Sequence, residues 1–266
     1  MTIIEILGYF CALLIGSTLG LIGGGGSILT VPVLVYILGI EPILATAYSL
    51  FVVGASALVG TLRNLKIGNI DLKTGIVFAI PSFIAVYYTR RFIVPAIPDE
   101  IFTIGNFSLN KEMGIMLFFA FIMLLASISM IRGRKNSKGL QNKVFNYPTI
   151  IIEGLFVGAL TGLVGAGGGF LIIPALVLLA GLPMKKAVGT SLMIIAIKSL
   201  IGFTGDLATS LAIDWLFLST FSLLAIIGMG IGLYLSKFIE GERLKKAFGY
   251  FVLFMAVFVL LKELAL

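Results

Sequence analysis

The chain has 266 residues, of which 59% are apolar and only 12% are charged, so a water-soluble domain of this composition would have too little polar surface. The net charge of +7 comes from short basic tracts beside apolar segments, which is typical of membrane orientation signals and argues against a nucleic-acid partner. The absence of His and the single Cys11 argue against a disulfide, a metal site, haem and Ser-His catalysis, so we expect no metal and no cofactor.

Breaks at Gly, Pro and charged residues divide the chain into ten apolar segments. The first half has segments near 3–22, 27–40, 43–62, 72–93 and 112–131, and the second half has segments near 148–166, 169–182, 185–204, 214–236 and 246–264. No Lys or Arg precedes the first segment, so we expect it to be retained and not cleaved as a signal peptide. The pattern predicts an all-α integral membrane protein with eight to ten hydrophobic segments.

Two of these segments are too short for an upright span, which needs about 20 residues. They are 27–40 and 169–182, and each directly follows a Gly-rich run. We expect each of them to be a half-helix or part of a re-entrant hairpin, because irregular backbone at membrane depth must be buried in protein. The alternative is that the Gly-rich runs lie at the membrane surface and that all ten segments span.

The two halves of the chain are related. Residues 16–60 match residues 158–202 at 16 of 45 positions, without a gap and at a constant offset of 142. An internal duplication explains this agreement best. We therefore divide the chain into a first membrane repeat at 1–131, a basic linker at 132–147 and a second membrane repeat at 148–266.

The distribution of charge predicts that the two repeats have opposite orientations. The linker has five basic residues and no acid between 132 and 143, and the loop near 63–73 is also basic, so both are expected on the cytoplasmic side. The repeat-related loop at 205–213 contains Asp206 and no Lys or Arg, so it is expected outside. Inverted repeats with interrupted helices are typical of secondary transporters.

The Gly-rich runs are the first candidate binding elements. If both are buried near the middle of the membrane, their free N–H groups and the starts of the following short helices form an anion cradle. The alternative is that these glycines only allow tight helix packing. The candidate residues are Gly23, Gly24, Gly25, Gly26 and Ser27 in the first run, and Gly165, Gly167, Gly168 and Gly169 in the second.

Polar residues inside the apolar segments are the second group of candidates. Thr30 and the paired Ser49 and Ser191 place hydroxyl groups where they can line a pathway, or can simply bond to their own helix. Lys198 lies inside a predicted span, where an ammonium group attracts an anion unless its side chain snorkels to the interface. Asp71 and Asp214 precede apolar runs and are expected to be helix N-caps.

The duplicated motif resembles the TauE/SafE family of membrane permeases over the whole chain. The specific marks are Gly-Leu-Ile-Gly-Gly-Gly-Gly-Ser with Val-Pro at 20–32, and Gly-Leu-Val-Gly-Ala-Gly-Gly-Gly with Ile-Pro at 162–174. The second motif has Ala where the first has Gly24. The resemblance implies a prokaryotic inner-membrane carrier for sulfur oxyanions or organosulfonates, such as sulfite or sulfoacetate.

We therefore predict a secondary transporter for a small anion that is bound between the two Gly-rich runs. Its partners are the anion and the lipid bilayer, and a homo-oligomer is compatible with the sequence. An intramembrane enzyme is the first alternative, but the chain has no His, and the sequence around Asp206 lacks the Gly-x-Gly-Asp motif of aspartyl proteases. An anion channel or a structural subunit of a membrane complex also stays open.

Overall fold

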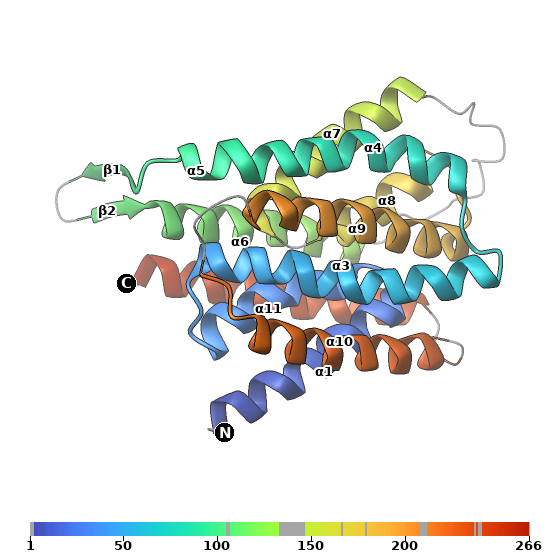
Figure 1. The fold of residues 1–266 in the computed structure, drawn as a ribbon, viewed down its shortest axis with the longest axis horizontal. Coiled ribbons are helices and arrows are strands. Elements are labelled where there is room, and N and C mark those ends of the chain that lie inside the picture. The colour runs from blue at the N-terminus through green and yellow to red at the C-terminus, as the bar shows by residue number, and fades with distance from the viewer. Residues whose placement is uncertain are drawn as a thin grey trace.

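The computed structural model describes residues 3–104, 107–132, 147–165, 167–178, 180–207, 212–236, 238 and 241–265. Most of the predicted linker and Ala166 lie outside these residues. The long helices lie side by side and run roughly along one direction (Figure 1). Within the described ranges, seven helices are long and apolar enough to cross a bilayer, so the predicted all-α membrane class is confirmed.

The first half begins with α1 (Ile3–Ile22) and a short return segment, made of η1 (Gly25–Leu29), α2 (Thr30–Pro32) and η2 (Val33–Ile37). It continues with α3 (Pro42–Lys66) and with a single long rod formed by α4 (Leu72–Tyr88), the π-helical turn η3 (Thr89–Ile93) and α5 (Val94–Ala96). The strands β1 (Glu100–Ile104) and β2 (Phe107–Asn110) then form an antiparallel hairpin, which the sequence analysis did not predict, before α6 (Lys111–Arg132).

The second half has the same order of helices. It consists of α7 (Tyr147–Val164), α8 (Gly169–Leu178), α9 (Met184–Leu207), α10 (Trp215–Leu235) and α11 (Gly241–Ala265). The last of these packs along α6 and carries no charge between Ala247 and Leu261. Asp71 and Asp214 cap α4 and α10 as predicted, because their Oδ1 atoms accept from the backbone N–H groups of Thr74 and Phe217 at 2.9 and 3.0 Å.

The return segment runs back along α1. Gly26, just after the turn, packs against Thr18 and Leu19 of α1, whereas Leu38, at its far end, lies against Gly8 near the start of α1. The chain reverses at Gly23 and Gly24, whose φ values are 75° and 144°. The first short segment is therefore the second arm of a hairpin and does not continue in the direction of α1.

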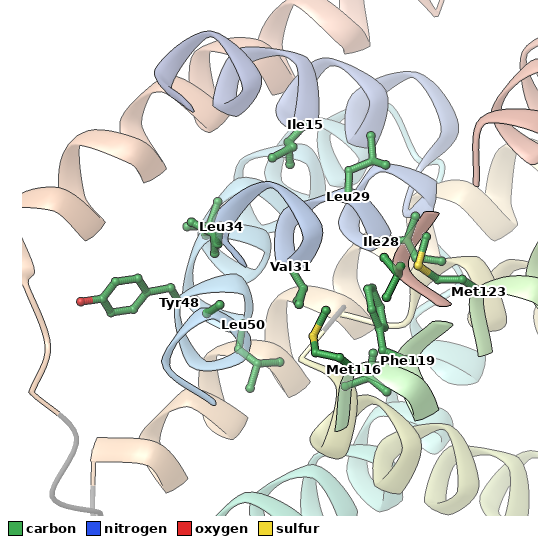
Figure 2. Close-up of a cluster of buried hydrophobic side chains, with 14 of the residues drawn as sticks. Ile15, Ile28, Leu29, Val31, Leu34, Tyr48, Leu50, Met116, Phe119 and Met123 are labelled. Atoms are coloured by element: carbon green, nitrogen blue, oxygen red, sulfur yellow. The ribbon is translucent and has the colours of Figure 1, made fainter. Parts of the chain in front are cut away.

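The apolar face of this return segment is part of the main core. Figure 2 shows Ile28 and Val31 beside Met116, Phe119 and Met123 of α6, and all five side chains are almost fully buried. This packing holds the hairpin inside the helix bundle. The glycine turn at its tip is consequently enclosed by protein.

Helix contacts in one half have counterparts in the other. The duplication relates α1 to α7, α3 to α9, α4 to α10 and α6 to α11. The contact of α1 with α10 then corresponds to that of α7 with α4, and the contact of α3 with α10 corresponds to that of α9 with α4. The pairs α3–α9 and α6–α11 correspond to themselves. This arrangement is the one that a two-fold relation between the halves requires.

The related helices α3 and α9 run in opposite directions. Leu50, early in α3, lies against Gly202 near the end of α9, and Leu192, early in α9, lies against Gly60 near the end of α3. The end of α3 and the start of α10 accordingly lie at opposite ends of the molecule (Figure 1). This direction is the one expected of inverted repeats, while their orientation in a bilayer stays a prediction.

Candidate functional site

The two glycine runs meet in the structure. A methyl group built on Gly24 would lie 2.7 Å from Cα of Gly169, and one built on Gly167 would lie 3.3 Å from Cβ of Ser27. Seven of the predicted glycines are buried in the structure. They are Gly23, Gly24, Gly26, Gly165, Gly167, Gly168 and Gly169. Gly25 opens η1, but its exposure is not among the described features. The two turns thus form one enclosed region and not two separate surface loops.

This region lies beside the middle of the two central helices. Gly167 packs near Val53 and Ile195, which lie close to the centres of α3 and α9, and Gly24 also packs against Ile195. Because α3 and α9 are both long and apolar enough to cross a bilayer, the turns lie beside the middle of two candidate spans. The alternative in which the glycine runs lie at the membrane surface does not agree with this geometry.

Glycine is required at Gly24 for two reasons. Its φ of 144° is a conformation that L side chains rarely adopt, and Gly169 leaves no room for a Cβ atom. The backbones of the two halves therefore approach each other directly. This close approach explains the need for glycine at Gly24 and Gly169.

Lys198 is the only basic residue of the predicted set, and it is fully buried in α9. Its Nζ donates to Oγ1 of Thr161 in α7 at 3.1 Å, and a methyl group built on Gly168 would lie 2.9 Å from the same nitrogen. The alternative of snorkelling is therefore wrong, because the ammonium group lies beside the second glycine turn. Among the described residues, no carboxylate pairs with it.

The predicted hydroxyl groups behave differently from one another. Ser191 Oγ donates to the backbone carbonyl of Gly23 and so joins α9 to the first glycine turn. Ser27 Oγ donates to the carbonyl of Gly24 at 2.7 Å. Thr30 and Ser49 are fully buried, and neither hydroxyl has a hydrogen-bond partner within the part of the chain that the structure describes. Buried hydroxyls normally have a partner, so these two are unusual.

A buried ion pair beside this region was not predicted. Arg90 in η3 is fully buried, and its Nε donates to Oδ2 of Asp206 at 2.9 Å. Its NH1 and NH2 groups also donate to Oγ1 of Thr46, each at 3.0 Å, and Thr46 packs against Gly165 of the second glycine turn. Asp206 was expected in an outward loop, but it lies in the last turn of α9 because this partner compensates its burial.

The available signal for this pair was Arg90 itself, a cation within the apolar segment predicted at 72–93. Arginine near the end of a segment is normally assigned to the interface. Its acid partner lies 116 residues away in the sequence, so no local pattern connects the two. The π-helical turn that carries Arg90 is a form found frequently at functional sites.

Comparison with known proteins agrees with this architecture. The family model described as sulfite exporter TauE/SafE matches residues 8–259. A probable membrane transporter protein of Xylella fastidiosa (strain 9a5c) is 28% identical over 262 residues, covering 95% of this chain and 93% of that protein. The probable membrane transporter protein YunE of Bacillus subtilis is 30% identical over 229 residues, covering 77% of this chain and 78% of its own.

A probable membrane transporter protein of Methanocaldococcus jannaschii is 30% identical over 207 residues and is matched over 72% of its length. No solved structure matches the chain significantly. The family match covers nearly the whole chain, including both glycine turns, α3 and α9. The chain therefore belongs to the sulfite exporter TauE/SafE family and is a multi-pass membrane transporter, not an enzyme.

Proposed function

We propose that this transporter carries a small anion, a sulfur oxyanion or an organosulfonate such as sulfite or sulfoacetate, and binds it where the two glycine turns meet. The observation that carries the proposal is Lys198, a buried cation beside Gly168 that has Thr161 and no carboxylate as its hydrogen-bond partner among the described residues. An ionisable side chain within a membrane is costly and marks a functional site by default.

The surrounding groups suit an oxyanion. The backbone at the two turns is buried, and the unpartnered hydroxyls of Thr30 and Ser49 add donors in the same half of the molecule as the first turn. The short helix α8 begins at Gly169, so its first N–H groups add a positive partial charge to the region of Lys198. An anion here exchanges its hydration shell for fixed donors.

Transport needs the site to open to each side in turn. The two halves are the natural moving parts, because the site lies between their glycine turns. We place the chain in a prokaryotic inner membrane as two inverted repeats, with the linker at 132–147 in the cytoplasm. A cell-negative potential drives a monoanion outward by about 2.3 kcal/mol per 100 mV, so export needs no coupling ion.

The test uses the purified protein in liposomes loaded with radiolabelled sulfite, sulfate, thiosulfate or sulfoacetate, with and without an imposed potential. We expect saturable flux of at least one sulfur anion and counterflow, which a channel does not give. Lys198→Met is expected to abolish flux while the protein still inserts and purifies as a folded species. The matched control is Lys185→Met, because Lys185 is an exposed lysine at the start of the same helix. Full flux in Lys198→Met would refute the proposed site.

A further inference from the structure

Among the described residues, the buried charged side chains, two cations and one anion, have a net charge of +1. Arg90, Lys198 and Asp206 are the charged residues found buried within the described part of the chain. Arg90 and Asp206 neutralise each other through their 2.9 Å contact. Lys198 is therefore the one buried charge that lacks a counter-ion among the residues whose surroundings are described.

The positive charge comes from only one of the two related halves. The position that corresponds to Lys198 in the first half is Ser56, at the repeat offset of 142. Ser56 is 1% exposed, and its hydroxyl has no hydrogen-bond partner within the described ranges. Three residues before each of these positions, Val53 and Ile195 both lie close to Gly167. At equivalent sequence positions, α9 thus carries an ammonium group and α3 carries a neutral hydroxyl.

Resting on the proposed function, we infer that the site selects anions with a single negative charge. A monoanion makes the occupied interior neutral, whereas a dianion leaves one uncompensated negative charge in a medium of low dielectric constant, where such a charge is costly. The substrate class is then a hydrogen-bonding monoanion, such as hydrogen sulfite or a sulfonate without a second acid group. This narrows the substrate class of the proposed function, because sulfoacetate has two negative charges at neutral pH and is then a poor substrate.

Two organosulfonates of similar size test this inference. 2-Hydroxyethanesulfonate has one charge and sulfoacetate has two, and both can compete at neutral pH with whichever labelled sulfur anion the liposomes transport. We expect the wild type to bind the monoanion at least about tenfold more tightly, which corresponds to about 1.4 kcal/mol. Equal competition, or stronger competition by sulfoacetate, would overturn the inference and leave the proposed anion site intact.

Variants that add a second buried cation, or move the cation from α9 to α3, test the inference further. Ser56→Lys places a second cation at the related position and is expected to reverse the preference toward sulfoacetate by about tenfold. The double variant Lys198→Ser with Ser56→Lys has a single cation again and is expected to regain the preference for the monoanion. An unchanged preference in a folded Ser56→Lys protein would contradict selection by charge. If the wild type transports no sulfur anion at all, both this inference and the proposed function fail.

Discussion

Arg90 and Asp206 connect the first and second halves of the chain through a buried ion pair at 2.9 Å. Arg90 comes from the π-helical turn η3, which follows α4, and Asp206 comes from the last turn of α9. The same guanidinium group also holds Thr46, which packs against the second glycine turn. The pair therefore links the position of that turn to the contact between the halves.

Removing one member of this pair leaves the other buried charge without this compensating ion pair. We expect Asp206→Asn and Arg90→Met each to lower the free energy of unfolding by about 3 to 5 kcal/mol. The double variant Arg90→Met with Asp206→Leu should recover much of this loss, because neither buried charge remains. Thermal unfolding in detergent measures all three proteins. Strictly additive losses would show that the two residues are not coupled.

The contact between Gly24 and Gly169 predicts a specific effect of one methyl group. Gly24→Ala should abolish transport, because its Cβ would lie 2.7 Å from Cα of Gly169 and would push the turns apart. The matched control is Gly39→Ala, whose φ of 68° is also left-handed but which has no atom within 4 Å of the added methyl group. Flux in liposomes distinguishes the two, and equal flux in both variants would argue against a functional contact.

The hydrogen bond from Lys198 to Thr161 predicts a graded effect on affinity. Thr161→Val removes the acceptor at 3.1 Å and leaves the ammonium group without this hydrogen bond. We expect an altered position of Nζ and about a tenfold rise in KM for the transported anion, since hydrogen bonds to charged groups contribute about 1.5 to 3 kcal/mol. Thr161→Ser retains the oxygen and should restore the wild-type KM. If Thr161→Ser does not restore the wild-type KM, the rise in KM comes from altered packing and not from the lost hydrogen bond.

The N-caps predict a change in stability without a change in transport. Asp71→Ala removes the acceptor for the N–H group of Thr74 and should lower the free energy of unfolding by about 1 kcal/mol. Asp71→Asn retains an acceptor and should lose less. Unfolding curves and flux are compared on the same preparations. A loss of flux in Asp71→Ala at unchanged stability would assign this residue a role beyond capping.

Much of the fold could be predicted from the sequence because apolar length is a strong signal in a membrane protein. The predicted segment at 3–22 coincides with α1, and the segment at 43–62 lies within α3. The short segments and the glycine runs also stood out, since a bilayer restricts irregular backbone to buried places. The β-hairpin between β1 and β2 was missed because it lies between spans, where periodicity of hydrophobicity gives little guidance.

The arrangement of polar groups could be predicted only in part. Duplication pointed to the glycine turns, and the structure brings Gly24 and Gly169 together. The sequence does not decide whether the ammonium group of Lys198 stays buried or reaches the membrane interface. A lysine two turns from a helix end is long enough for either. Arg90 and Asp206 could not be paired, because their contact depends on how α4 and α9 cross and on no feature within either segment.

The meeting of Gly24 with Gly169 has a consequence for motion. Interlocked side chains resist sliding, because each must change its rotamer before its neighbour can pass. At this point the facing surfaces are bare main chain, so relative displacement of the hairpin tips requires no such rearrangement. The two hairpin tips can therefore shift against each other at this contact without a change of side-chain rotamer.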